Sequence, residues 1–132
     1  MSAGERVAAA ARDAVGASFR LHGRTPASGL DCVGLVAHAL AAGGHAGAVP
    51  TGYRLRTGDA DRVAAVLDEA IGRAAGNRPG DVLLMRTGPG QLHLGIRTAG
   101  GLVHADAGLR RVVERPGPLP WPLLGAWRME AG

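Results

Sequence analysis

Three side chains, one cysteine and two histidines, have the types and surroundings that covalent acyl transfer needs. Cys32 is the only cysteine among 132 residues. Asp31 precedes it and can accept the free N–H groups of a first helical turn, where the helix dipole favours a thiolate over a thiol. A thiolate that attacks a carbonyl also needs a base, which takes up a proton and returns it to the leaving group. His93 and His104 are the candidates for that base and for the residue that orients it.

The two histidines fall in a predicted β-hairpin. Residues 91–96 and residues 102–106 alternate in the manner of strands, and such strands present successive side chains to opposite faces. The intervening residues 98–101, with the sequence Thr-Ala-Gly-Gly, are typical of a hairpin turn. The hairpin therefore places both histidines on neighbouring strands.

The turn sets the register of this hairpin. If Ala99 and Gly100 are its two loop residues, position 93 lies opposite position 106 and position 95 lies opposite position 104. His93, His104 and Asp106 then share one face, and the two histidines are diagonal neighbours roughly 7–8 Å apart at Cα. A β-bulge would decide whether His104 or Asp106 pairs best with His93.

Three helices are predicted to position these elements. The residues after Cys32 include apolar side chains at the spacing of one helical face: Val33, Val36, Ala37 and Leu40. This helix is expected to stop at Gly43-Gly44. An amphipathic helix over residues 5–15 precedes it, and a third helix over residues 59–75 follows it, capped by Asp59 or Asp61.

Beyond the hairpin, three strands are predicted, over residues 82–85, 110–115 and 124–129. The first of these is a continuous apolar run, as expected of a central strand buried on both faces. Prolines recur in residues 116–122 and lack the N–H that a sheet needs, so this segment is predicted to cross a sheet edge in extended form. Trp121 and Trp127 are interpreted as anchors for the C-terminal segment, and Trp121 could instead stack on a sugar ring.

Composition limits the classes of function. The length suits a single domain over residues 1–132 with one core. All 15 basic residues are arginine, which excludes a Schiff-base lysine and a P-loop lysine. The formal charge of +4 is spread along the chain and accompanies no nucleic-acid motif, so no specific nucleic-acid partner is expected. No apolar run reaches the roughly 18 residues of a membrane span, so no membrane insertion is expected.

Four segments resemble, in order and spacing, the NlpC/P60 cysteine peptidases. They are Asp-Cys-Val-Gly-Leu-Val at 31–36, Arg-Pro-Gly-Asp-Val-Leu-Leu-Met at 78–85, His-Leu-Gly-Ile at 93–96 and Val-His-Ala at 103–105. The chain looks most like the small peptidases encoded with phage tail genes, which are related to those of gene transfer agents. The resemblance implies an α+β, papain-like fold, in which the nucleophile helix packs on a central antiparallel β-sheet.

The resemblance also implies a reaction and a set of site residues. The reaction is hydrolysis of amide bonds in peptidoglycan stem peptides, typically between D-glutamate and a diamino acid. By position, Cys32 matches the nucleophile, His93 the base and His104 the residue that orients the base. Asp31 and Asp106 are expected to support them, and no metal or other cofactor is expected.

A possible substrate groove is predicted from four further residues: Phe19, Arg20, Tyr53 and Arg54. The family usually has a tyrosine where this chain has Phe19, and commonly a serine where it has Val33, so two hydroxyl groups are missing. Residues 50–58 are interpreted either as a loop whose side chains contact an acidic stem peptide or as a surface connector.

Other functions are compatible with these residues. A structural component of a phage tail tip could keep the fold with reduced or no activity, as the two missing hydroxyl groups would allow. A metal-binding module could use Cys32, His93, His104 and Asp106 as zinc ligands. An acyltransferase would use the same thioester chemistry as the peptidase.

The N-terminal residues 1–15 are predicted to form an amphipathic helix rather than a signal peptide. A wall hydrolase without an export signal must leave the cell by another route. We therefore expect synthesis in the bacterial cytoplasm, carriage in a phage-like particle together with its tail proteins, and action in the periplasm or cell wall of a target cell.

Overall fold

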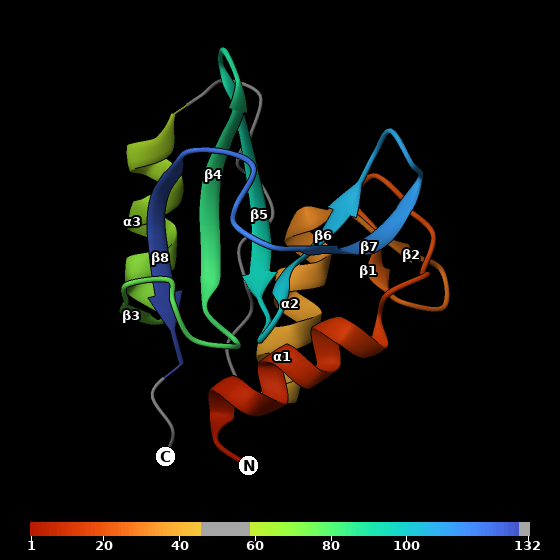
Figure 1. Ribbon diagram of the computed structural model, residues 1–132, viewed down its shortest axis with the longest axis horizontal. Coiled ribbons are helices and arrows are strands. Elements are labelled where there is room, and N and C mark those ends of the chain that lie inside the picture. The colour runs from red at the N-terminus through yellow and green to blue at the C-terminus, as the bar shows by residue number, and fades with distance from the viewer. Residues whose placement is uncertain (46–58, 130–132) are drawn as a thin grey trace.

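The computed structural model describes residues 1–45 and 59–129, which form three helices and eight strands. The helices are α1 (Ala3–Asp13), α2 (Cys32–Ala42) and α3 (Ala60–Ala70) (Figure 1). The strands are β1 (Arg24–Thr25), β2 (Gly29–Leu30), β3 (Gly72–Arg73), β4 (Val82–Gly88), β5 (Gln91–Arg97), β6 (Gly101–Asp106), β7 (Arg111–Pro116) and β8 (Leu123–Arg128).

Six of the strands form one antiparallel sheet in the order β3-β8-β4-β5-β6-β7. The short strands β1 and β2 pair with each other and lead into α2. Helix α2 packs on β5 and β6 and against α1, whereas α3 packs near β8 and β3 (Figure 1). The predicted α+β class and the packing of the cysteine-bearing helix on an antiparallel sheet are confirmed.

Side-chain caps explain where the helices begin. Asp31 accepts the N–H of Gly34 at 2.8 Å before α2, and Asp59 accepts the N–H of Arg62 at 3.0 Å before α3. Helix α3 is shorter than predicted, because Ile71 is extended and the next residues pair with β8 instead of continuing the helix. None of the helices in the described part of the chain is long and apolar enough to cross a membrane.

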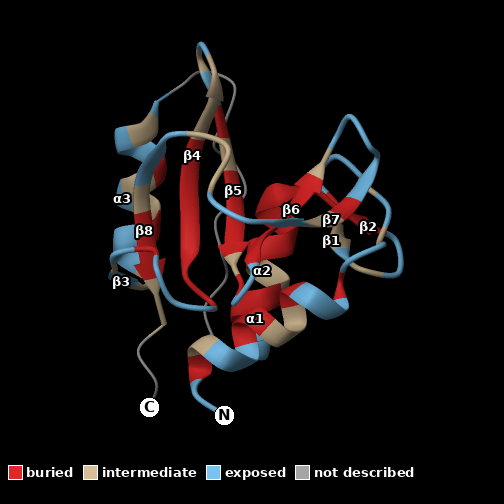
Figure 2. Ribbon diagram, in the orientation of Figure 1, coloured by how far each residue is buried: buried red, intermediate tan, exposed pale blue. Residues whose placement is uncertain are grey.

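The sheet buries side chains on both of its faces. On one face, Leu84, Leu94 and Val103 join the main core with the apolar residues of α1 and α2. On the other face, a second cluster is formed by Leu83, Met85, Leu102 and Ala126. Strand β4 therefore contributes to both clusters, as its apolar run predicted, and it is buried over most of its length (Figure 2).

The proline-containing segment between β7 and β8 was predicted to cross an edge of the sheet, and that prediction was wrong. It passes over the face of the sheet, and its residues Leu119 and Trp121 pack on the second cluster (Figure 1). The strand order explains this path, because β7 lies at one edge and β8 lies beyond β4, so the chain must cross β6, β5 and β4. Trp127 does anchor the C-terminal strand, since it is fully buried and donates to Asp68 at 2.9 Å.

Candidate active site

Asp31 connects the chain that precedes α2 to the first turn of the helix through hydrogen bonds. Its carboxylate accepts three hydrogen bonds, from the N–H of Gly34 at 2.8 Å, the N–H of His22 at 2.7 Å and Nη1 of Arg24 at 2.9 Å. Only 8 % of Asp31 is exposed. The carboxylate thereby holds the backbone of Cys32 at the start of the helix, as its predicted capping role requires.

Gly34 allows this turn to contact the preceding loop backbone. A Cβ atom at this position would overlap with the carbonyl oxygen of Gly23. No rotamer relieves an overlap between a Cβ and a backbone oxygen, so either the loop or the helix would have to shift. The sequence motif includes Gly34, but the reason for a glycine there is visible only in the packing.

We expect Gly34→Ala to lower the free energy of unfolding by about 2 kcal/mol, the order of cost found for overpacked sites. Urea denaturation followed by circular dichroism measures this change. Gly100→Ala is the matched control, because a Cβ there has no neighbour within 4 Å and the stability should stay within about 0.5 kcal/mol of the original. Equal stability of the two variants would contradict the close contact.

The Cys32 thiol is buried, with 7 % of the residue exposed. Burial raises the pKa of the thiol from 9.0 to about 11, and the negative charge of Asp31 acts in the same direction. The backbone N–H groups of Leu94, Val33 and Cys32 itself lower that pKa, as expected at a helix start, but they do not outweigh burial. The expectation that the helix start favours a thiolate is therefore not supported, because burial outweighs these N–H groups and favours the neutral thiol near pH 7.

Because the pKa of Cys32 lies at about 11, we expect its alkylation by iodoacetamide to accelerate about tenfold per pH unit between pH 7 and 9.5, without a plateau. Mass spectrometry of quenched samples gives the rate at each pH. A model peptide with one free cysteine is the control, and its rate should level off above its midpoint near pH 8.5. A plateau for Cys32 below pH 8 would show that a thiolate exists in the resting protein.

His93 on β5 and His104 on β6 contact each other directly. Nε2 of His93 lies 3.0 Å from Nδ1 of His104, and the ring planes stand at 88°. The pairs Ile96–Val103 and Arg97–Leu102 confirm the predicted register next to the turn. The two imidazoles meet as the diagonal arrangement predicted.

Burial favours the neutral form of both imidazoles. Burial lowers the pKa of His93 from 6.5 to about 4, and the charge of His104 lowers it further, whereas Asp106 raises it. Burial also lowers the pKa of His104, with Arg115 acting in the same direction and Asp106 against it. Asp106 thus acts on the pair through its charge, while its Oδ1 accepts the N–H of Leu109 at 3.0 Å. The ring of His93 is hydrogen-bonded by His104 and not by Asp106.

The Cys32 thiol contacts β5 at the residue next to His93. The N–H of Leu94 interacts with the sulfur of Cys32, and Leu94 directly follows His93 in the strand. Since Nε2 of His93 is used in the bond to His104, its Nδ1 is the nitrogen free of that bond. The arrangement combines a neutral thiol, a neutral base and a second imidazole that holds the base in one orientation.

Trp121, interpreted from the sequence as an anchor of the C-terminal segment or a sugar-stacking residue, lies against the histidine pair. Its ring centroid lies 5.7 Å from that of His93 and 5.3 Å from that of His104, and the interplanar angles are 84° and 88°. Trp121 is 17 residues beyond His104 in the sequence numbering, in the segment that crosses the sheet. Only its place between two prolines hinted that its conformation was restricted.

The predicted groove residues are only partly described. Phe19 is half-buried and packs against the core that includes Cys32, whereas Arg20 is exposed. Tyr53, Arg54 and the predicted loop 50–58 lie outside the described residues. Val33, at the position where the family commonly has serine, is 6 % exposed and is part of the main core, which explains why an apolar side chain is suited to it.

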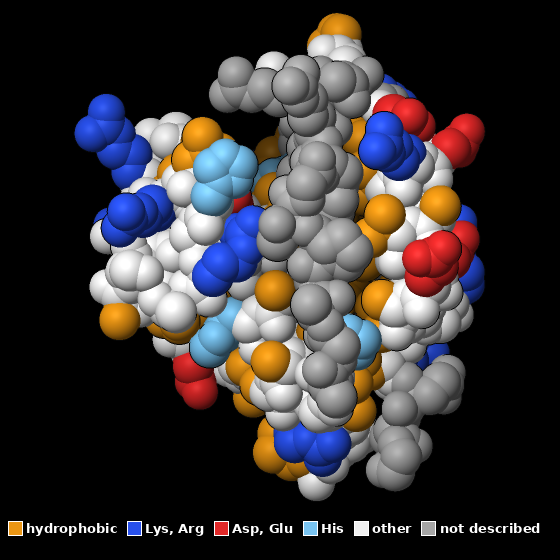
Figure 3. Space-filling view, turned by 180° about the vertical axis from the view of Figure 1, so that it is seen from behind, with side chains coloured by type: hydrophobic (Ala, Val, Ile, Leu, Met, Phe, Trp, Pro, Cys, Tyr) orange, Lys and Arg blue, Asp and Glu red, His pale blue; other side chains and the backbone are white. Residues whose placement is uncertain are grey.

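Charged side chains of both signs lie on the face seen from behind. Acidic side chains lie over α3 with arginine side chains among them, whereas arginine and histidine side chains lie on the side of the β1–β2 sheet (Figure 3). Within residues 1–45 and 59–129, no group of three or more His, Cys, Asp or Glu side chains is placed to hold a metal ion. The alternative of a zinc module built on Cys32 and the histidine pair gains no support from this geometry.

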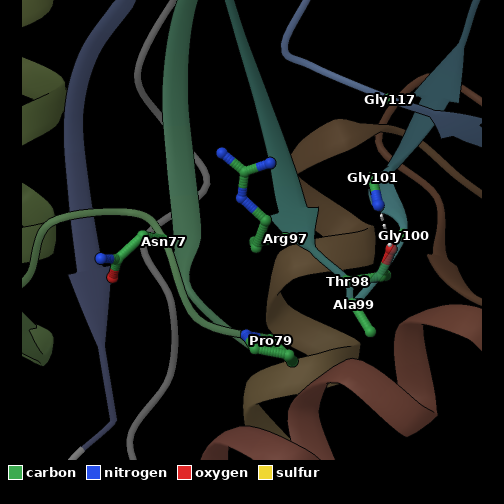
Figure 4. A pocket seen from close by; sticks show the side chains of 8 residues that line it. All are labelled: Asn77, Pro79, Arg97, Thr98, Ala99, Gly100, Gly101 and Gly117. Carbon is green, nitrogen blue, oxygen red and sulfur yellow. Dashed lines mark hydrogen bonds between the residues drawn. The ribbon is translucent and has the colours of Figure 1, made fainter.

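An open hollow of about 440 Å³ lies at the other end of β5, at the β5–β6 turn (Figure 4). It is lined by Asn77, Pro79, Arg97, Thr98, Ala99, Gly100, Gly101 and Gly117. Nε of Arg97 donates to the carbonyl oxygen of Gly76 at 2.9 Å, so this guanidinium is already engaged. Neither Cys32 nor His93 lines the hollow, and it is distinct from the candidate site.

No protein-family model and no curated protein matches the chain. Solved structures do match it. NlpC1 from Trichomonas vaginalis is 23% identical, with a TM-score of 0.73 over 99% of this chain and 45% of that one. RipB from Mycobacterium tuberculosis is 22% identical, with a TM-score of 0.66 over 98% of this chain and 66% of that one. The P60 domain of an antigen from M. avium subspecies paratuberculosis is 20% identical, with a TM-score of 0.65 over 98% and 96% of the two chains.

The chain spans about half the length of the Trichomonas vaginalis proteins NlpC1 and NlpC2, 45% and 47% of them. It spans almost the whole of the M. avium domain. Matches at identities of 20–23% over nearly the full described chain establish an architecture. The chain has the α+β fold of NlpC/P60 domains.

Proposed function

We propose that this protein is a cysteine peptidase that hydrolyses amide bonds in peptidoglycan stem peptides. The observation that carries the proposal is the joint placement of the Cys32 thiol at a helix start and the hydrogen-bonded His93–His104 pair on the adjacent strands. RipB, which has the same fold, is a peptidoglycan hydrolase. The arginine and histidine side chains around the β1–β2 sheet also suit a substrate rich in carboxylates (Figure 3).

In the proposed reaction, Nδ1 of His93 takes the proton from Sγ of Cys32 as the sulfur attacks the scissile carbonyl carbon. The oxyanion of the tetrahedral intermediate accepts the backbone N–H of Cys32 at the positive end of α2. His93 then protonates the departing amine and a thioester remains. Finally His93 removes a proton from water, which attacks the thioester and releases the acid and the thiol.

The two pKa shifts bear on when the proton leaves the sulfur in this first step. The pKa of the thiol is about 11 and that of His93 is about 4, so the neutral pair is favoured over a thiolate–imidazolium pair. The proton therefore leaves the sulfur during the attack rather than before it. His104 supports this step because its Nδ1 forms a hydrogen bond with Nε2 of His93. This hydrogen bond holds the His93 ring in one orientation.

The bond that we propose for cleavage joins D-glutamate to a diamino acid. We further propose that the protein is made in the bacterial cytoplasm, is carried with tail proteins in a phage or gene-transfer-agent particle, and acts in the periplasm or cell wall of the target cell. The support for these finer proposals is the resemblance of the motif segments at 31–36, 78–85, 93–96 and 103–105 to peptidases encoded with phage tail genes.

The test is the release of new amino groups from purified peptidoglycan by the original protein and by Cys32→Ala. We expect release by the former only, with fragments whose masses place the new amino terminus on the diamino acid. Circular dichroism of both proteins controls for folding, and a thiol reagent assay confirms that Cys32 is reduced. If neither protein cleaves although both are folded, the alternative of a structural tail component replaces the peptidase.

A further inference from the structure

We infer that Trp121 is a positioning residue of the candidate site: its indole ring covers the His93–His104 hydrogen bond, keeps water from it and holds the base in its reactive orientation. The catalytic part of this inference rests on the proposed peptidase function. The part that concerns the histidines does not, and it can be tested without any substrate.

The geometry of the three rings carries the inference. Trp121 stands edge-to-face with both histidines, at centroid distances of 5.7 Å and 5.3 Å, and the two imidazoles stand edge-to-face with each other at 5.1 Å. In such pairs the polarised edge of one ring faces the π-surface of the other, which is a favourable arrangement for aromatic pairs. One tryptophan therefore restricts both imidazoles at once.

Trp121 is itself held in place by its surroundings. Pro120 and Pro122 flank it, and a residue that precedes proline is restricted to extended backbone conformations. The carbonyl oxygen of Pro122 accepts the N–H of Arg86 on β4 at 3.1 Å. The indole also packs on the cluster that contains Leu83 and Met85. The ring is consequently ordered by the sheet and not by the histidines alone.

The charged side chains that act on the histidine pair come from two further positions. Asp106 on β6 favours the protonated form of both rings, and Arg115 on β7 disfavours it for His104. The guanidinium carbon of Arg115 also lies 5.9 Å from the centroid of the Trp121 ring. These charges partly offset one another, so exclusion of water has a large share in keeping the pair neutral.

Loss of the indole should admit water to the pair and should raise the pKa of His93 towards its ordinary value of 6.5. If the pKa of His93 is higher, the neutral form that can act as a base disappears at a higher pH when the solution is acidified. The acidic limb of the kcat/KM profile should then move to higher pH, and kcat should fall because the imidazole is less well oriented.

The test compares Trp121→Leu, which keeps apolar volume on the cluster, with Trp121→Phe, which restores a ring, and with Leu119→Ala, which loosens the same segment. Histidine titration by NMR with ¹⁵N-labelled histidine is measured on each folded protein. We expect the His93 midpoint to rise by more than one pH unit in Trp121→Leu, by less than half a unit in Trp121→Phe, and to stay unchanged in Leu119→Ala.

A measurement on the original protein needs no variant. The proton between Nε2 of His93 and Nδ1 of His104 should give a resolved downfield ¹H signal near pH 7, because shielding from water slows its exchange. Absence of that signal, or unchanged His93 midpoints in a folded Trp121→Leu, would overturn the inference. Should Trp121→Leu be unfolded, the presence or absence of the downfield signal in the original protein decides the matter.

Kinetics on a stem peptide separates this inference from the proposed function. In Trp121→Leu we expect kcat to fall about tenfold with KM within twofold, and the acidic limb to shift with the His93 midpoint, while Trp121→Phe recovers most of the rate. If the original protein cleaves nothing, the peptidase proposal fails while the NMR results still judge the role of Trp121. If it cleaves and the pH profile of Trp121→Leu is unchanged, only the positioning role fails.

Discussion

Replacement of His93 by glutamine is expected to lower kcat/KM for stem-peptide cleavage by about a thousandfold or more, with little change in KM. Glutamine keeps the approximate volume and can still bond with His104, but its amide cannot take a proton from Cys32. The buried thiol, whose pKa is about 11, then has no base to accept its proton during the attack. Initial rates of amino-group release at pH 7 measure the loss.

His104→Gln is the matched control for that variant. It should lose only about 10- to 100-fold in kcat, because an amide can still bond with Nε2 of His93 and hold the ring. Equal losses in the two variants would contradict the assignment of His93 as the base and His104 as its orienting partner. A loss confined to His104→Gln would reverse the two roles.

The same substitution at His93 should also change how stability depends on pH. The pKa of His93 is about 4 in the folded protein against 6.5 for an ordinary histidine, so the unfolded chain binds the extra proton between these values. Stability is therefore full above pH 6.5 and falls as the pH drops to 4, by on the order of 3 kcal/mol from this group. Urea unfolding at several pH values should show a shallower fall for His93→Gln than for the original protein.

Asp81→Ala is expected to lower the free energy of unfolding by about 3 kcal/mol or more, the range for breaking a buried ion pair. Asp81 is fully buried and accepts Nε and Nη2 of Arg128 at 2.7 Å and 2.9 Å. Its carboxylate also accepts the N–H of Arg78 at 3.2 Å. The substitution leaves the Arg128 guanidinium without this carboxylate and releases the turn before β4 from β8.

Arg12→Ala provides the comparison for a surface pair. Arg12 lies 3.3 Å from Glu114, but 62% of its side chain is exposed, so its loss should change the stability by less than about 0.5 kcal/mol. Urea denaturation measures both variants. A loss for Asp81→Ala as small as that for Arg12→Ala would show that the buried pair contributes little to the stability of this fold.

Local patterns in the sequence were sufficient for the elements that carry the candidate site. The Asp31 cap, the helix that begins at Cys32 and the register of the hairpin next to its turn depend on interactions between residues close in the chain. The diagonal contact of His93 with His104 followed from that register. The end of α3 was not predictable in this way, because the residues after Ile71 leave the helix to pair with β8, far away in the sequence.

The turn before β4 also combines a feature that the local sequence predicts with one that depends on a distant residue. Its Arg-Pro-Gly-Asp sequence is typical of a turn, and the apolar run that follows it predicted a central strand. That the aspartate binds Arg128, 47 positions away in the chain, is a property of the folded sheet. The two classes of contact differ in physical origin: local hydrogen bonds determine the turn, and strand order determines the ion pair.

The sequence alone therefore determined which residue types could perform thiol chemistry and which helix and hairpin hold them. Only the tertiary structure decided their electrostatic state, because the burial that raises the pKa of Cys32 and lowers that of His93 comes from packing between distant segments. The contact of Trp121 with both histidines has the same origin, since the segment between β7 and β8 must cross the sheet to reach its place beside β4. Spacing along the chain encodes capping and register, whereas burial and strand order arise only when the whole chain packs.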